Sequence, residues 1–212
     1  MIKVILVDDH KMFRESLCKM LKMEGIADVV AEAQNGVEFL ELLNHHQPDL
    51  VLLDIAMPQM DGIEAATKAI EQYPDLKILT LSSFGDEHYY YSMIEAGVKG
   101  FVLKSAGITE LMQAIEEISH GGSWFSNELL RKVIATMGRN QHKEKPATEL
   151  SERELQVLNM VCNGFTNEQI ATELCLSYDT IKWHRANLLS KTNANNTAAL
   201  VMYAIKNKLI EI

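Results

Sequence analysis

The chain has 212 residues, of which 47% are hydrophobic and 23% charged, and its formal net charge is −9. These values are ordinary for a globular protein of one large or two small domains. No stretch reaches the roughly 20 apolar residues of a membrane span, and the N-terminal MIKVILVDD turns acidic too soon for a signal peptide. The three cysteines lie far apart without a CxxC pair, which argues against a disulfide framework or a zinc site. We therefore expect a cytoplasmic protein with no membrane partner.

The charge is spread unevenly along the chain. Residues 1–138 hold 11 Lys/Arg against 21 Asp/Glu, whereas residues 150–212 hold 6 against 6. An acidic first part and a neutral last part indicate different roles. Neither part is basic enough to indicate nucleic-acid binding by charge alone.

Strand-like and helix-like patterns alternate along the first 120 residues. Short apolar runs typical of buried strands lie at 2–7, 29–31, 50–54, 77–83 and 100–104. Apolar residues at helical spacing follow them at 11–25, 36–43, 62–72, 89–96 and 108–118. Five such alternations predict an α/β fold with a parallel sheet and helices on both faces. Right-handed crossovers then bring the carboxyl ends of all strands to one edge.

The second half of the chain has a different pattern. A helix is possible over 126–138, and the polar, proline-containing stretch 139–149 is typical of a linker. Residues 150–212 show only helical patterns. We expect a domain over 1–122, a linker over 123–149 and an all-α domain over 150–212.

Chemically distinctive residues close the predicted strands of the first domain. They are Asp8, Asp9, Asp54, Ser82 and Lys104. Three carboxylates brought together repel one another unless a cation neutralises them, and an all-oxygen ligand set with open positions suits Mg²⁺. With an ammonium and a hydroxyl added, the edge predicts a site that stabilises a phosphoryl group. The nucleophile would be a carboxylate, which forms an acyl phosphate.

These residues, in this order, resemble the receiver domain of two-component response regulators. The resemblance covers roughly residues 1–122 and includes Asp8-Asp9, Asp54 with Met57-Pro58 and Asp61-Gly62, Ser82, and the run Phe101–Lys104. It implies a doubly wound, CheY-like sheet in the strand order 2-1-3-4-5.

The resemblance also implies a role for each matched residue. Asp54 is then the phosphoacceptor, supplied by a sensor histidine kinase. Asp9, Asp54 and the Ala56 carbonyl ligate Mg²⁺, and Asp8 acts through water. Ser82 and Lys104 contact the phosphoryl group, and Phe101 is the switch aromatic that follows Ser82 inward.

Two positions bear on how long the phosphoryl group survives. They are the residues two beyond Asp54 and Ser82, which are Ala56 and Phe84. Neither side chain can orient a water molecule for attack, so we expect a long-lived phosphoryl group.

The C-terminal part contains four predicted helices, at 151–164, 166–176, 178–192 and 197–210. Ser151 with Glu154 three residues later is a capping-box signature, and Ser177 caps the third helix. The sharp turn between Leu174 and Ser177 predicts a helix-turn-helix.

The stretch 164-GFTNEQIATELCLSYDTIKWHRANLLSK-191 resembles the LuxR-type DNA-binding domain of the NarL/FixJ regulators. The resemblance implies that 178–190 is the recognition helix. Helical spacing places Lys182, Arg185, Ala186 and Leu189 opposite the core, with Arg185 also an alternative to His184 on the inner face beside Ile181 and Leu188. The resemblance implies DNA contacts from Thr180, Lys182, Trp183, Arg185 and Lys191. It also implies a dimer contact through the last helix at Leu200, Tyr203 and Ala204.

Together these expectations describe a phosphorylation-regulated transcription factor that uses Mg²⁺ and binds double-stranded DNA. Its partners would be a sensor histidine kinase, a second copy of the chain when phosphorylated, and RNA polymerase. It would be no enzyme beyond its own phosphoryl transfer and dephosphorylation. An alternative is a constitutive DNA-binding regulator whose receiver serves only for dimerisation. A phosphohydrolase of the haloacid-dehalogenase kind would need an Asp where Ala56 stands, and an adaptor that binds only proteins would show no DNA footprint.

Overall fold

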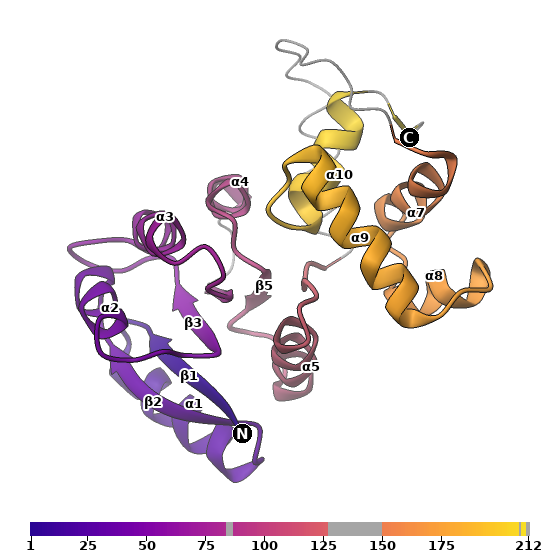
Figure 1. The fold of residues 1–212 in the computed structure, drawn as a ribbon. Coiled ribbons are helices and arrows are strands. Elements are labelled where there is room, and N and C mark those ends of the chain that lie inside the picture. Colours follow the sequence, from indigo (N-terminus) through magenta and orange to yellow (C-terminus); the bar gives the residue numbers. More distant parts are fainter. Residues whose placement is uncertain (84–86, 127–149, 208, 211–212) are drawn as a thin grey trace. The chain divides into compact units, whose positions relative to one another are not determined.

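The computed structural model describes residues 1–83, 87–126, 150–207 and 209–210 (Figure 1). The chain separates into two compact units, Met1–Trp124 and Phe125–Ile212, and each is treated by itself. The predicted helix over 126–138 and the linker stretch 139–149 lie outside the described residues, apart from Ser126.

Unit 1 is built on a parallel sheet. Its strands are β1 (Ile2–Val7), β2 (Ala27–Ala33), β3 (Leu50–Asp54), β4 (Ile78–Ser82) and β5 (Gly100–Leu103). The helices between and after them are α1 (Lys11–Met23), α2 (Gly36–Leu43), α3 (Gly62–Gln72), α4 (Glu87–Ala96) and α5 (Ile108–Ser119). The strands lie in the order β2-β1-β3-β4-β5, which confirms the predicted fold class and strand order.

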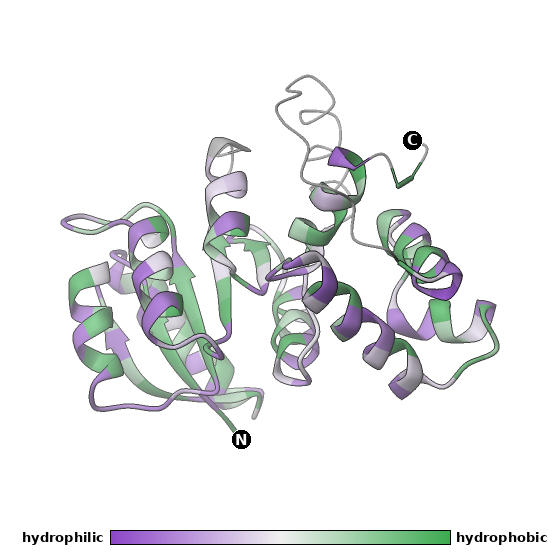
Figure 2. Ribbon diagram, turned by 45° about the horizontal axis from the view of Figure 1, so that its top comes forward, coloured by the Kyte–Doolittle hydropathy of each residue, from purple (hydrophilic) through white to green (hydrophobic). Residues whose placement is uncertain are grey.

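The two faces of the sheet are covered by different helices. On one face, alternate strand residues such as Val4, Leu6 and Leu52 form one core cluster with Leu17 of α1 and Ile115 of α5. On the other face, α3 contacts both α2 and α4. Every residue of β3 and β4 is buried, which explains their unbroken apolar runs. Figure 2 shows the strands as predominantly hydrophobic ribbons, whereas the helices carry hydrophilic and hydrophobic stripes.

Two details of unit 1 differ from the sequence-based expectation. Strand β2 runs over seven residues instead of three, because it pairs with the full length of β1. After α5 the chain also returns to β5, where Trp124 and Gly100 form an isolated parallel bridge. The Trp124 carbonyl accepts from the Phe101 N–H at 2.8 Å.

Unit 2 contains four described helices, α7 (Glu152–Cys162), α8 (Asn167–Glu173), α9 (Tyr178–Thr192) and α10 (Thr197–Lys206). Capping boxes start α7 at Ser151 and α8 at Thr166, and Ser177 caps α9. The turn between α8 and α9 passes through Cys175 at a φ of 53°, a left-handed conformation. The predicted helix-turn-helix is therefore present.

The core of unit 2 joins all four helices. Its fully buried members include Val157, Leu158, Ile170, Ile181, Leu188, Leu200, Val201 and Ala204. Since each helix contributes apolar residues at helical spacing, the packing follows from the periodicity of the sequence.

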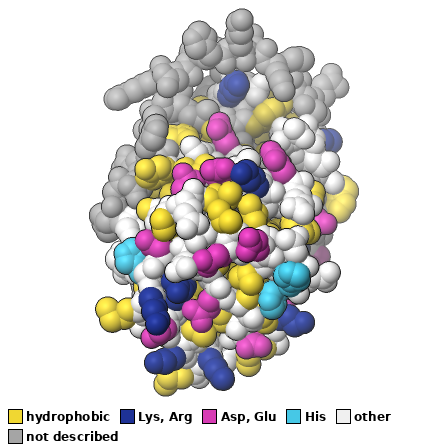
Figure 3. All heavy atoms as spheres, turned by 90° about the vertical axis from the view of Figure 1, so that its left-hand side faces the viewer, with side chains coloured by type: hydrophobic (Ala, Val, Ile, Leu, Met, Phe, Trp, Pro, Cys, Tyr) yellow, Lys and Arg dark blue, Asp and Glu magenta, His cyan; other side chains and the backbone are white. Residues whose placement is uncertain are grey.

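The acidic character of unit 1 extends over its surface. Figure 3 shows acidic side chains distributed across the face that it presents, with Lys and Arg more frequent toward its lower edge. The surplus of Asp and Glu over residues 1–138 is thus not confined to one cluster.

Gly62 provides a test of how tightly the loop after β3 is packed. A Cβ at this position would overlap the Asp54 carbonyl oxygen and approach the Ile55 Cα to 2.9 Å, and both are backbone atoms that cannot move aside. We expect Gly62→Ala to lower the free energy of unfolding of unit 1 by roughly 2 kcal/mol or more. Chemical denaturation measures the effect. Gly107→Ala is the control, because no atom lies within 4 Å of a Cβ there. An effect at Gly62 no larger than that at Gly107 would contradict the expectation.

Candidate functional site

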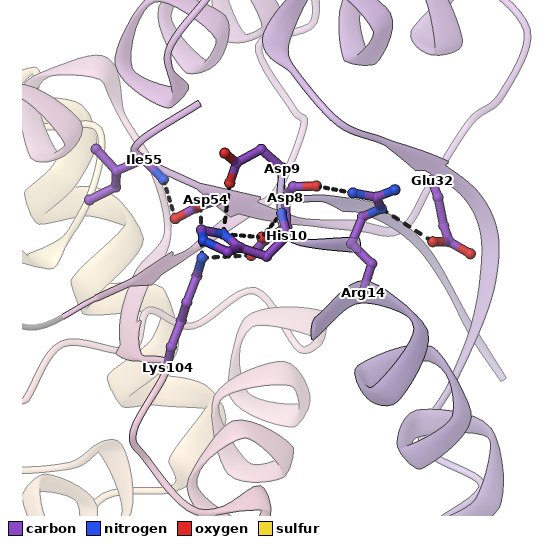
Figure 4. A network of polar contacts seen from close by, with 8 residues as sticks. All are labelled: Asp8, Asp9, His10, Arg14, Glu32, Asp54, Ile55 and Lys104. Atoms are coloured by element: carbon purple, nitrogen blue, oxygen red, sulfur yellow. Dashed lines mark hydrogen bonds and ion pairs between the residues drawn. The ribbon is translucent and has the colours of Figure 1, made fainter. Parts of the chain in front are cut away.

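The predicted acidic edge is assembled in the structure. Asp8 and Asp9 follow β1, Asp54 ends β3, and Lys104 follows β5. Asp8 is fully buried and Asp54 is 3% exposed. The Lys104 ammonium lies 2.7 Å from Asp8 Oδ2 and 2.7 Å from Asp54 Oδ2 (Figure 4). Neighbouring parallel strands β1 and β3 place the two carboxylates side by side.

Burial and charge set the protonation behaviour of this cluster. Burial raises the pKa of Asp54, and the nearby Asp8 carboxylate raises it further, against the opposing effect of Lys104 and the Ile55 N–H. That N–H donates to Asp54 Oδ1 at 2.8 Å. Burial by itself lowers the pKa of Lys104, but the bonds to Asp54 and Asp8 outweigh it and the pKa is raised. Lys104 therefore remains an ammonium that partly neutralises the carboxylates.

The residues fit a hard divalent cation. Asp8, Asp9, His10 and Asp54 each offer a ligand atom, and these atoms all lie within 4.8 Å of one another. Three carboxylates against one ammonium leave the cluster negative, and carboxylate oxygens are the donors that Mg²⁺ prefers. His10 Nδ1 lies 2.8 Å from Asp9 Oδ1, so the imidazole is a polar neighbour of the cluster.

The other predicted members of the site lie around this cluster. Ser82 is buried at the end of β4, and its hydroxyl donates to the Ser83 carbonyl at 2.8 Å. Phe101 is 5% exposed and packs edge-on against Tyr90 of α4, with ring centroids 4.4 Å apart. Phe101 is thus already buried when Ser82 is bonded to the neighbouring carbonyl.

Ala56 borders a small cavity of about 280 Å³. Its other lining residues are Ile55, Met57, Asp61 and Tyr89. The Asp61 carboxylate is committed to the first turn of α3, where it accepts from the Glu64 N–H at 2.9 Å. The methyl group of Ala56 can orient no water molecule for attack on a phosphoryl group. Phe84, the other residue expected to influence the lifetime of that group, lies outside the described residues.

Sequence reasoning did not find Arg14 or Glu32. The Arg14 guanidinium donates to the Asp8 carbonyl and lies near the Glu32 carboxylate of β2 (Figure 4). The sequence offered one indication of Arg14, which is a long polar side chain one helical turn after His10 on a helix expected to pack against the sheet. That signal identifies no partner, because Glu32 is 18 residues away along the chain.

In unit 2, the structure corrects part of the surface of α9 that was predicted to face the DNA. Lys182, Trp183 and Ala186 are exposed, and Trp183 retains 59% of its accessible surface. Arg185 instead bonds within the domain, to Asn167 Oδ1 at 2.7 Å and Thr197 Oγ1 at 2.8 Å. Leu189 packs against the core. Arg185 and Leu189 therefore do not face away from the core, since their side chains reach α8, α10 and the apolar interior.

Two predicted phosphate contacts already have partners in the domain. The Lys191 ammonium lies 2.8 Å from Glu154 Oε2, which joins the end of α9 to the start of α7. The Thr180 hydroxyl lies 2.8 Å from Ser177 Oγ at the start of α9. Both interactions stabilise the position of the recognition helix.

The dimer contact predicted on α10 needs correction. Leu200 is 1% exposed and Ala204 is fully buried, because both belong to the core of unit 2. Their side chains cannot meet a second copy of the chain while this core is intact. Tyr203, on the same helix, is partly exposed.

A search for membrane spans covered the part of the chain that the structure describes. It found no helix long and apolar enough to cross a bilayer.

Comparisons with known proteins agree with both units. Residues 4–116 match the family model for the response regulator receiver domain, and residues 148–204 match that of the luxR family of bacterial regulatory proteins. The chain therefore belongs to the response regulators that join a receiver to a LuxR-type DNA-binding domain, and it is a phosphorylation-dependent, DNA-binding transcription regulator.

Individual relatives match over nearly the whole chain. The chain is 34% identical over 210 residues to the transcriptional regulatory protein LiaR of Bacillus subtilis, covering 99% of this chain and 100% of LiaR. It is 32% identical over 226 residues to DegU of Brevibacillus brevis, covering 100% and 96%. Among solved structures, the response regulator ChrA of a heme-sensing two-component system aligns with a TM-score of 0.53 at 29% identity, covering 99% of this chain and 98% of ChrA. A LuxR-family response regulator from Aurantimonas sp. aligns with a TM-score of 0.60 at 30% identity, covering 65% and 99%.

Glu154 makes the stability of unit 2 depend on pH. Its bond with Lys191, together with the Ser151 N–H, lowers its pKa from 4.5 to about 2 against the effect of burial. A lowered folded-state pKa stabilises the fold above the ordinary value, and this contribution is lost as the pH falls from 4.5 toward about 2. We expect Glu154→Gln to lower the free energy of unfolding at neutral pH by roughly 1–3 kcal/mol and to flatten its pH dependence in that window.

The measurement is denaturation of the full chain, with unit 2 followed by Trp183 fluorescence in a Trp124→Phe background. Glu168→Gln removes an exposed carboxylate of α8 and serves as the control. Equal pH profiles for the two variants would contradict the assignment.

Proposed function

We propose that Asp54 is the phosphoacceptor and that a sensor histidine kinase is its donor. The observation that carries the proposal is the placement of Asp54 at the end of β3, with Lys104 2.7 Å away and Asp8 and Asp9 beside it. An Asp54 carboxylate oxygen attacks the phosphorus of a phosphohistidine, a P–O bond forms, the P–N bond breaks and the imidazole leaves. This transfer, together with dephosphorylation, is the only catalysis that we assign to the chain.

The metal assigned to the site is Mg²⁺, with Asp9, Asp54 and the Ala56 carbonyl as ligands and Asp8 acting through water. When bound, Mg²⁺ supplies charge neutralisation for the incoming phosphoryl group. Lys104, whose ammonium lies 2.7 Å from Asp54 Oδ2, contributes a second positive charge.

The switch uses residues of β4 and β5. Ser82 gives up its bond to the Ser83 carbonyl and turns its hydroxyl toward the phosphoryl group. Phe101 responds to that movement, together with its edge-on partner Tyr90. A change of state of this kind requires that phosphorylation stabilise one conformation more than the other.

The output is binding to double-stranded DNA by α9. Lys182 and Trp183 enter the major groove, and Thr180 and Lys191 contact phosphates. Arg185, in the light of its bonds to Asn167 and Thr197, acts by fixing α9 against α8 and α10. Phosphorylation promotes a homodimer, in which Tyr203 stays a candidate contact, and two copies bind DNA more tightly than one. RNA polymerase is the downstream partner.

The organisation that serves this function is a receiver over 1–122, a linker over 123–149 and a DNA-binding domain over 150–212. A bacterial transcription regulator acts in the cytoplasm, where its DNA lies.

The phosphorylation step is tested with acetyl phosphate and Mg²⁺. We expect the wild type to gain one phosphoryl group by mass spectrometry, to dimerise and to bind DNA more tightly, and we expect Asp54→Asn to do none of these. Asp75→Asn, which removes an exposed carboxylate, is the matched control. If wild type and Asp54→Asn behave alike in mass, oligomeric state and DNA binding, the receiver is a dimerisation module alone.

The DNA-binding role of Lys182 is tested by Lys182→Ala. We expect the affinity for a selected DNA site to fall by about 1–3 kcal/mol and the base preference at one position to relax. Thermal midpoints are measured in parallel, so that a loss of DNA affinity is distinguished from a loss of stability. Lys206→Ala, at the exposed end of α10, serves as the control in fluorescence anisotropy. Equal losses for the two variants would contradict a groove contact.

A further inference from the structure

The turn that carries Asp8 and Asp9 is fastened to its surroundings at several points. The Asp8 N–H donates to the Ala33 carbonyl at 3.1 Å, which ties the turn to β2. The His10 N–H donates to Asp8 Oδ1 at 2.8 Å, which closes the turn on itself. The Asp8 carbonyl also belongs to this turn, and its hydrogen-bond donor is Nη1 of Arg14.

Arg14 is unusually enclosed for an arginine. Its side chain is 13% exposed, whereas arginines are rarely buried without a specific partner. Its Nε lies 3.4 Å from Glu32 Oε2, but the Glu32 side chain is 41% exposed. An ion pair of that kind contributes little stability. The bond to the Asp8 carbonyl is therefore the stronger reason for the position of the guanidinium (Figure 4).

The Asp8 carbonyl belongs to the peptide group that joins Asp8 to Asp9. Rotation of this peptide changes the direction in which the Asp9 side chain leaves the backbone. Asp9 follows the last strand residue by two positions, and the sheet ladder that ends at Val7 does not hold it. The orientation of the Asp9 carboxylate toward Asp54 thus depends on what holds this peptide, as well as on His10, whose Nδ1 lies 2.8 Å from Asp9 Oδ1.

We propose that Arg14 is a positioning residue for the divalent-metal site, which acts by holding the Asp8–Asp9 peptide so that Asp9 faces Asp54. Glu32 supports it by holding the guanidinium from β2. The inference rests on the proposed function, because it takes the acidic cluster as the metal site. Groups that orient metal ligands in this way change metal affinity by about 10–100-fold when they are removed.

The direction in which Mg²⁺ affinity changes on removal of Arg14 distinguishes a positioning role from a purely electrostatic one. Arg14 is a positive charge close to a cation site, so its charge by itself opposes Mg²⁺ binding. If charge were its whole contribution, removal of Arg14 would tighten Mg²⁺ binding. Positioning predicts the reverse, and a purely structural role predicts a lower thermal midpoint with unchanged Mg²⁺ affinity.

The experiment is a Mg²⁺ titration of the full chain, followed by NMR through the backbone amides of His10 and Ile55. We expect Arg14→Met to raise the half-saturating Mg²⁺ concentration by about tenfold. Arg14→Lys, which keeps the charge and one donor group, should fall between Arg14→Met and the wild type. Glu32→Gln should give a smaller rise, because Arg14 keeps its bond to the Asp8 carbonyl.

Lys11→Met is the matched control, since it removes one positive charge from the same helix at an 80% exposed side chain. Thermal midpoints are measured in parallel. A second readout is the rate of phosphorylation by acetyl phosphate against Mg²⁺ concentration. Arg14→Met should shift the Mg²⁺ requirement and leave the rate at saturating Mg²⁺ within about twofold, because the acceptor and Lys104 are intact.

The inference is overturned if Arg14→Met raises the half-saturating Mg²⁺ concentration by less than about threefold relative to Lys11→Met, or if it lowers that concentration. If Arg14→Met does not fold, Arg14→Lys is judged by the same limit. A wild type whose amides show no saturable response to Mg²⁺ overturns the metal site itself and the inference with it. If the wild type responds to Mg²⁺ and the Arg14 variants have the same half-saturating Mg²⁺ concentration, only the role of Arg14 is overturned.

Discussion

Two buried carboxylates, Asp8 and Asp54, lie at the ends of neighbouring strands with one ammonium, Lys104, 2.7 Å from each. This ammonium opposes the mutual repulsion of the two carboxylates and offsets part of the free energy lost with their hydration. Burial raises the pKa of Asp54 while Lys104 opposes the rise, and one ammonium balances only part of the charge of the carboxylates. The negative charge that remains favours a divalent cation, and we propose that this cation and Lys104 together neutralise the charge of the incoming phosphoryl group.

The sheet is what makes this arrangement possible. Strands β1, β3, β4 and β5 are parallel neighbours, so their carboxyl ends deliver Asp8, Asp54, Ser82 and Lys104 to one edge. The buried interior of β3 leaves Asp54 little freedom of position. The flanking loops are held just as closely, by Gly62 against the Asp54 carbonyl and by Arg14 against the Asp8 carbonyl. Rigid surroundings suit the switch that we propose, in which Ser82 and Phe101 make small movements.

Unit 2 uses several of its cations to build its own fold. Lys191 pairs with Glu154, and Arg185 joins Asn167 to Thr197. These bonds orient α9 but leave fewer positive charges for phosphates in an already neutral segment. We therefore propose that the pairing of two copies, more than charge, supplies the DNA affinity of this domain.

The sequence by itself determined the fold class, because apolar runs and helical periodicity report which face of each element is buried. It also determined the members of the acidic edge, since strand polarity brings strand-ending residues together. It could not reveal the pairing of Arg14 with Glu32 or of Lys191 with Glu154, because those contacts join residues distant along the chain. The bond from Arg14 to the Asp8 carbonyl is local, but it depends on the conformation of the turn after β1. Helical spacing placed Arg185 and Leu189 on a face that the structure corrects, and the family resemblance placed Leu200 and Ala204 in a dimer contact although both are buried in the core. The spacing of residues in the sequence gives only the direction in which each side chain leaves the helix axis. The packing of neighbouring helices decides which of these directions are buried and which partners a long side chain can reach.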